Sequence, residues 1–272
     1  MTKRYECKLS PALLAKAVEE LNEPEDNIER LAAIDSLKGE FKKSNPDISL
    51  LNDDDEFILR FLRAKKFVIP KALTTLTNYH KKKEVWPEVV EKVENPTVLS
   101  SALSNNLITK IDGNAKNGSY IVVGFPGSND VPLPDFFSCV ILSLEKMLED
   151  EEFQIHGLTV IEDLTYFGTN MMKYLGPSVS KKFLSLVQEA LPVRIKSLNM
   201  VNEPTIFNVI YAIIRPFLKE KMRKRLQVIG TKYETLHLIV SPEILPERYL
   251  GSGKSLNFDK WKESLLGEDT AL

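Results

Sequence analysis

The chain has 272 residues, and 43% of them are hydrophobic, which is enough to fill a sizeable core in one large domain or in a small and a medium one. Its formal net charge of -2 and its isoelectric point of about 6.1 exclude the basic excess of a general nucleic-acid-binding protein, although they allow a local basic patch. Neither Cys7 nor Cys139 stands in a metal-ligand spacing, and we interpret both as reduced thiols. The charged N-terminus has no signal-peptide pattern, and no apolar run approaches the roughly 20 residues that span a bilayer. We therefore expect a cytoplasmic protein whose membrane contact is peripheral.

The first ninety or so residues are predicted to form helices only. Ser10 followed by Pro11 is typical of a helix start, because serine caps the free N–H groups and proline fits the first turn. A second helix is expected from near Pro24, and a third after residues 52–55 (NDDD), whose three aspartates suit a helix N-terminus. A fourth should begin at Pro70.

Beyond residue 95, short apolar strands alternate with helices. We expect strands at residues 107–111, 119–125, 157–163, 196–201 and 235–240. We expect helices at residues 133–149 and 178–190, and two more within 204–227 that Pro216 separates. This alternation predicts an α/β fold with a largely buried sheet.

Motifs for catalysis or metal binding are absent. Residues 251–255, GSGKS, resemble the end of a phosphate-binding loop, but Arg248 stands where that loop needs glycine. Residues 53–55 lack the alternating ligands of a calcium loop, and the three histidines lie in three separate elements. No serine-nucleophile or zinc-protease motif occurs. We therefore predict a protein that is not an enzyme and that has no metal or cofactor.

The segment 191–225 is the most informative part of the sequence. Its residues 206–218 are apolar on nearly every side, yet too few to span a bilayer. Such a helix is either buried in the core or placed between a lipid cavity and a membrane, where it could act as a lid. The basic run 219–225 follows at once, and it is either a solvated face or a patch for anionic lipid headgroups.

Several motifs in chain order give the chain a specific resemblance. They are residues 57–67 (FILRFLRAKKF), the strand 157–163, residues 202–204 (NEP), residues 215–218 (RPFL) and residues 244–249 (ILPERY). With these motifs, most of the chain resembles the CRAL-TRIO family of lipid-transfer proteins, particularly its α-tocopherol-transfer and retinaldehyde-binding branch. Leu250 departs from the glycine usual in the family, so the turn there is expected to differ slightly.

The resemblance implies a helical N-terminal subdomain at residues 1–92. It also implies a lipid-binding domain at residues 93–272, with a mixed, mostly parallel sheet flanked by helices. A gate helix at about residues 205–214 would close an apolar cavity. The positions that match the family's cavity are Phe137, Val140, Ile141, Leu144, Leu158, Val160, Glu162, Phe183, Leu186, Val187, Leu191, Leu198, Phe207, Ile210 and Ile214. Each apolar residue among them could equally belong to the ordinary core.

Glu162 differs from the other cavity positions because a buried carboxylate is costly unless it is paired or hydrogen-bonded. The retinaldehyde-binding branch has a glutamate at this position and a lysine that matches Lys182. This similarity favours a ligand with a polar end, or a buried water. The alternative is that Glu162 pairs with a cation of the fold.

The tocopherol-transfer branch also has a basic cleft for phosphoinositides. The matching positions here are Arg63, Arg194, Lys196, Lys221 and Arg225, all of them cationic. The resemblance thus implies a monomeric, non-catalytic carrier of a tocopherol, retinoid, carotenoid or other isoprenoid that docks reversibly on phosphoinositide membranes. The alternative is a phosphoinositide-binding adaptor or trafficking protein without a dedicated cargo.

Overall fold

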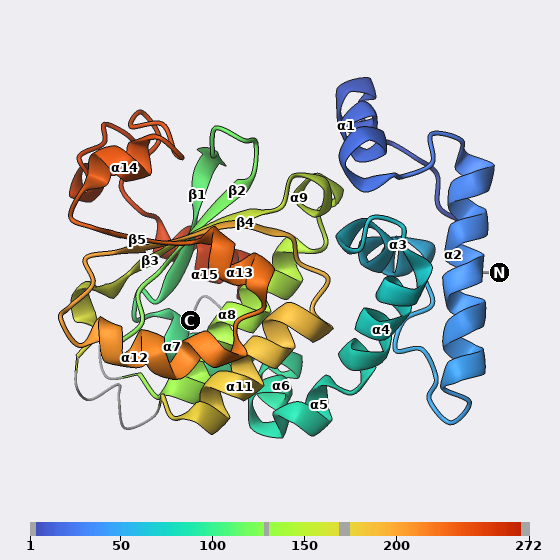
Figure 1. The fold of residues 1–272 in the computed structure, drawn as a ribbon, viewed down its shortest axis with the longest axis horizontal. Helices are drawn as coiled ribbons and strands as arrows, with labels where there is room; N and C mark the ends of the chain where they lie inside the picture. Colours follow the sequence, from blue (N-terminus) through green and yellow to red (C-terminus); the bar gives the residue numbers. More distant parts are fainter. Residues whose placement is uncertain (1–3, 128–130, 169–174, 268–272) are drawn as a thin grey trace.

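The computed structural model describes residues 4–127, 131–168 and 175–267. The N-terminal helices form one end of the molecule and the sheet with its covering helices forms the other (Figure 1). The helices of the first part are α1 (Pro11–Leu21), α2 (Asn27–Ser44), α3 (Asp55–Ala64), α4 (Ile69–His80), α5 (Lys82–Val85), α6 (Pro87–Glu94) and α7 (Ser100–Leu103). The strands are β1 (Ile108–Asn114), β2 (Tyr120–Gly124), β3 (Leu158–Asp163), β4 (Ile195–Val201) and β5 (Leu226–Gly230). The helices among and after them are α8 (Leu133–Met147), α9 (Glu151–His156), α11 (Pro177–Ser185), α12 (Phe207–Ile214), α13 (Glu220–Arg225), α14 (Tyr233–His237) and α15 (Phe258–Leu266).

The first two helices begin at residues whose side chains cap them. The Ser10 hydroxyl accepts a hydrogen bond from the backbone N–H of Leu13 at 3.3 Å, as the sequence predicts for α1. The second helix begins at Asn27 and not near Pro24, because the Asp26 carboxylate accepts hydrogen bonds from the first free N–H groups of α2.

The sheet has the strand order β1-β2-β3-β4-β5, with β1 antiparallel to β2 and the other neighbours parallel. Each parallel strand lies beside the strand before it, so right-handed crossovers carry every connecting helix to the same face. Helices α8, α11 and α12 lie on that face, and α14 lies on the other (Figure 1). The predicted α/β fold with a mixed, mostly parallel sheet is confirmed.

The two faces of the sheet contact different hydrophobic clusters. Leu158 and Val160 of β3 point into the large cluster beneath the connecting helices. Ile161, on the opposite face of the strand, packs in a smaller cluster with Leu236 and Tyr249. Any ligand space on the helical face is therefore separated from the smaller cluster by the sheet itself.

The expected last strand at residues 235–240 is wrong. Helix α14 covers Tyr233–His237, and Leu236 and Val240 are both fully buried in the smaller cluster. These residues are four apart, which places them on one side of a helical turn. Strand β5, Leu226–Gly230, takes the edge of the sheet instead, directly after α13.

One other helix differs from expectation. The helix predicted at 178–190 changes after Ser185 into a π-helical turn, Leu186–Ala190. Helix α6 crosses residue 92, the expected boundary between the two parts, and one hydrophobic cluster contains residues from both sides of it. Within the described residues, no helix is long and apolar enough to cross a membrane.

Candidate functional site

An apolar cavity of about 170 Å³ lies between the helical face of the sheet and helices α8, α11 and α12. On the sheet side it is lined by Leu198 in the middle of β4 and by Glu162 and Met200 near the carboxyl ends of β3 and β4. Carboxyl ends of parallel strands are where open α/β sheets usually bind ligands. The cavity is smaller than the roughly 300–1,000 Å³ of most small-molecule pockets, so a large occupant would need its wall to move.

Helix α12 forms one wall of the cavity. Phe207 and Ile210 are buried against the cavity, and Tyr211 and Ile214 also line it. On the outer side, Val209 is 48% exposed. The helix thus presents apolar side chains both to the cavity and to solvent, which agrees with the unusual apolar pattern of its sequence.

Glu162 is the one carboxylate among the described residues that line the cavity. Its Oε2 atom has no hydrogen-bond partner among the described residues. Burial raises the pKa of the carboxyl group to about 7, and the charge of Asp163 adds to the rise. Gly124 of β2 makes the space for it, because a Cβ atom at that glycine would lie 2.7 Å from Oε2.

Ser180 of α11 is a second polar group without a partner at this cavity. Its side chain is 3% exposed, and its hydroxyl has no hydrogen-bond partner among the described residues. Lys182, which the family resemblance singled out, does not belong to the described residues that line the cavity. Among the described residues that line this apolar cavity, Glu162 and Ser180 have buried polar atoms without a partner, and these could bind a polar end.

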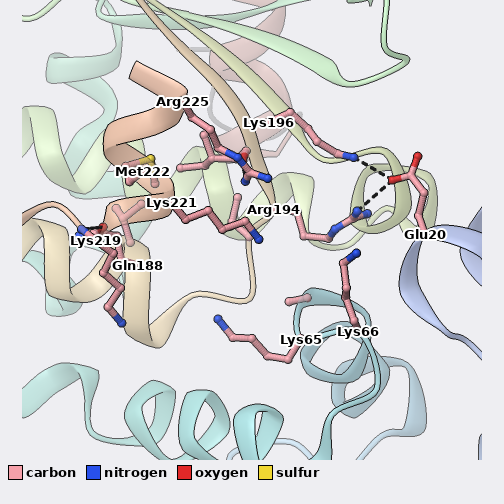
Figure 2. A pocket seen from close by; sticks show the side chains of 14 residues that line it. Glu20, Lys65, Lys66, Gln188, Arg194, Lys196, Lys219, Lys221, Met222 and Arg225 are labelled. Carbon is pink, nitrogen blue, oxygen red and sulfur yellow. Dashed lines mark hydrogen bonds and ion pairs between the residues drawn. The ribbon is translucent and has the colours of Figure 1, made fainter. Parts of the chain in front are cut away.

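A separate cleft of about 400 Å³ lies next to this cavity, between the N-terminal helices, β4 and α13 (Figure 2). Its cationic lining residues are Lys65, Lys66, Arg194, Lys196, Lys219, Lys221 and Arg225. Two of them are fixed by backbone acceptors, since Arg194 donates to the Ile155 carbonyl and Arg225 donates to the Ile195 carbonyl. Of the described residues that line the cleft, Glu20 is the only acidic one.

Burial in the cleft disfavours the charged forms of several of its cations. Burial, together with the charges of Lys219 and Lys221, lowers the pKa of Lys65 to about 8. Burial also lowers the pKa of Lys196, Lys221 and Arg225. An anion bound among these groups would favour their charged forms, so the cleft is suited to a polyanion.

The backbone of β4 brings two of these cations together. Leu158 of β3 pairs with Ile195, and Thr159 pairs with Ser197. Lys196 therefore has no partner residue in β3 and forms a β-bulge in β4. Such bulges redirect side chains at the ends of strands. As a result Arg194 and Lys196 both reach the same edge of the cleft, where both contact Glu20.

Comparison with known proteins places this geometry in a family. The model of the CRAL/TRIO domain matches residues 105–251, and the model of the CRAL/TRIO N-terminal domain matches residues 33–78. The chain is 34% identical over 268 residues to human alpha-tocopherol transfer protein-like, covering 97% of this chain and 77% of that protein. The chain belongs to the CRAL/TRIO family.

Two further relatives come from the same comparisons. Human Clavesin-2 is 33% identical over 266 residues, covering 96% of this chain and 80% of that protein. A solved structure described as the crystal structure of Sfh5 has 15% sequence identity and a TM-score of 0.47, and the match covers 94% of this chain and 92% of that chain.

Within this CRAL/TRIO chain, the predicted cavity residues divide into two groups. Those that line the cavity are Phe137, Val140, Glu162, Phe183, Leu198, Phe207, Ile210 and Ile214. Those that lie outside it, in the surrounding hydrophobic core, are Ile141, Leu144, Leu158, Val160, Leu186, Val187 and Leu191. Leu158 and Val160 share the face of Glu162 but precede it along β3, and both are buried in the main hydrophobic cluster.

The predicted phosphoinositide residues also divide. Arg194, Lys196, Lys221 and Arg225 line the cleft, and Arg63 does not.

Arg63 is fully buried and donates to Glu23 at 2.8 Å and to Gln154 at 2.9 Å. Glu23 also pairs with Arg30 at 2.8 Å, so Arg63 belongs to a buried ion network that holds the N-terminal helices. Lys65, two residues further along, lines the cleft in its place.

The glycines of the GSGKS segment have a packing role. A Cβ atom at Gly251 would lie 2.0 Å from the Leu245 carbonyl oxygen, and one at Gly253 would lie 2.5 Å from the Ile244 carbonyl carbon. Both glycines are therefore needed for close backbone contacts. In the described part of the chain, no group of three or more His, Cys, Asp or Glu side chains is arranged to hold a metal ion.

Proposed function

We propose that this chain binds one small hydrophobic molecule in the cavity beneath α12 and exchanges it at phosphoinositide-containing membranes, without chemical change. One observation carries the proposal: helix α12, which forms one wall of the apolar cavity, is joined by a short turn to α13, whose residues line the cationic cleft. The names of the relatives, which include a tocopherol transfer protein-like protein, support the same class of cargo.

The junction between α12 and α13 supports a coupling of the two sites. The turn Arg215–Phe217 connects the helices, and Leu218 after it lines the cavity. Gln188 holds this junction, because its amide donates to the Phe217 carbonyl at 3.1 Å and its oxygen accepts from the Lys219 N–H at 2.9 Å. Phosphates bound by α13 would pull on α12 through this short connection and open the cavity, so the two sites would be linked reciprocally.

The polar groups of the cavity suggest the chemistry of the cargo. Tocopherols, retinoids and oxygenated isoprenoids combine a long apolar body with one hydroxyl or carbonyl group. The carboxyl of Glu162, with a pKa of about 7, exists partly in its protonated form at neutral pH and can then donate a hydrogen bond. Ser180 can donate or accept one.

The alternative is an adaptor that recognises phosphoinositides and has no dedicated cargo. Native mass spectrometry of the purified protein, followed by organic extraction, separates the two functions. A stoichiometric hydrophobic molecule supports a carrier and identifies its class. A protein that is empty after expression in a cell that makes isoprenoids, yet binds phosphoinositide vesicles, supports the adaptor.

Membrane docking is tested by substitutions within α13. Lys221→Ala with Arg225→Ala removes two cations of the cleft, and at about 1 kcal/mol each this should weaken binding to bisphosphorylated phosphoinositide vesicles roughly thirtyfold. Arg223→Ala with Lys224→Ala is the matched control, because it removes the same charge from the same helix but outside the cleft. Equal binding by both double variants and the wild type would refute the docking site.

A further inference from the structure

The cationic cleft already contains an anion that belongs to the protein. Glu20 reaches into it from α1, and its Oε2 atom lies 2.8 Å from Lys196 Nζ and 3.2 Å from Arg194 Nη2 (Figure 2). Its other oxygen lies 2.6 Å from Lys16 Nζ on the same helix. A carboxylate is thus placed against two cations, Arg194 and Lys196, that a phosphate in this cleft would be expected to contact.

Glu20 remains charged at this position. Burial opposes its charge, but hydrogen bonds from Lys16, Lys196 and Arg194 outweigh that effect and lower the pKa of its carboxyl to about 2. Its side chain is still 30% exposed, so the ion pairs are accessible to solvent and to competing anions.

The helix that carries Glu20 has a small attachment of its own. Ala17 and Leu21 of α1 pack with Ile155 in a buried cluster that is separate from the main core. Immediately after the helix, Asn22 adopts a left-handed conformation with φ of 55°, and Glu23 is anchored in the buried ion network. Leu9 and Leu13 also pack against this cluster, so α1 is held along its length by one small hydrophobic cluster outside the main core. A segment with so small an apolar attachment can open locally.

We propose that Glu20 is an internal competitor for the cleft, occupying Arg194 and Lys196 until the phosphates of a membrane lipid displace it. The proposal rests on the phosphoinositide binding proposed above and adds its regulation. Because the carboxylate must give up both cations, lipid binding releases the Glu20 contacts that help to hold α1. Membrane docking is then weaker than it would be in the same cleft without Glu20. Helix α1 changes its contacts only when the headgroup is bound.

The test compares two isosteric variants that change the net charge equally. Glu20→Gln removes the competing charge, whereas Glu19→Gln alters the adjacent, exposed residue, which does not line the cleft. Binding is measured by co-sedimentation with phosphatidylcholine vesicles that do or do not contain a phosphatidylinositol bisphosphate. An exposed ion pair changes an equilibrium constant by about two- to fivefold, so losing two should make Glu20→Gln bind roughly tenfold more tightly. Glu19→Gln should bind like the wild type.

A second measurement distinguishes the source of the phosphate. Soluble inositol trisphosphate should also bind Glu20→Gln more tightly if the competition concerns the headgroup alone. If only the vesicles distinguish the two variants, the membrane surface itself displaces Glu20, and a competition within the headgroup site is refuted.

The binding measurements distinguish a failure of the competitor role of Glu20 from a failure of phosphoinositide docking. If the wild type binds the vesicles and Glu20→Gln binds no more tightly, or no more tightly than Glu19→Gln, the competitor role is refuted while phosphoinositide docking stands. If neither the wild type nor Glu20→Gln binds, the proposed docking fails and the competitor role fails with it.

Discussion

The buried carboxyl of Glu162 should make the stability of the folded protein depend on pH in a direction opposite to that of most acids. Burial, with the charge of Asp163, raises its pKa from 4.5 to about 7. The folded state therefore binds this proton more tightly than the unfolded state does. The stabilisation is fully present below pH 4.5 and is lost as the pH rises through 7.

The size of the effect follows from the pKa difference. A rise from 4.5 to about 7 corresponds to at most about 3.4 kcal/mol, at 1.36 kcal/mol per pKa unit. Between about pH 5 and pH 8, the same two pKa values give a loss of about 2.5 kcal/mol. Glutamine at this position has nearly the same shape and no charge, so Glu162→Gln should lack this component of the pH dependence.

Urea unfolding of the wild type and of Glu162→Gln across this pH range measures the component directly. The free energy of unfolding of the variant should rise, relative to that of the wild type, by about 2.5 kcal/mol from pH 5 to pH 8. Glu234→Gln, at an exposed position on the other side of the sheet, is the control and should follow the wild type. A difference between Glu162→Gln and the wild type that stays constant with pH would refute the reasoning.

Three further substitutions test the assignments made above. Arg63→Met should lower the free energy of unfolding by about 3 kcal/mol or more, since Glu23 would lose one of its buried partners, and urea unfolding would detect it. Lys65→Met should instead raise the free energy of unfolding by about 1–2 kcal/mol, a figure taken from the lowered pKa of Lys65 and discounted for its partial exposure. The same variant should bind phosphoinositide vesicles more weakly. Gly124→Ala should cost about 1 kcal/mol, because its Cβ atom would lie 2.7 Å from Glu162 Oε2 and the end of that flexible side chain would have to leave its preferred rotamer. The cost should shrink in a Glu162→Ala background, as a double-mutant cycle would show.

The sequence by itself determined those features that depend on residues close together in the chain. The capping serine at residue 10 defined the start of α1, and the β-branched run at 157–163 predicted β3. The alternation of such strands with helices predicted the α/β fold. Motifs spread over the whole chain were sufficient to predict the family, and the basic run after residue 218 was sufficient to predict a cationic surface.

The tertiary structure alone decided which of two similar residues occupies a site. Arg63 and Lys65 are both cations of one helix end, but only the fold places Glu23 against the first and the open cleft beside the second. Leu158 and Glu162 share one face of β3, but only the packing of the helices determines where that face is covered and where it borders a cavity. The competing carboxylate of Glu20 had no signal in the sequence. A local pattern specifies the face of an element on which a side chain lies, whereas its partner across the interface comes from a distant part of the chain.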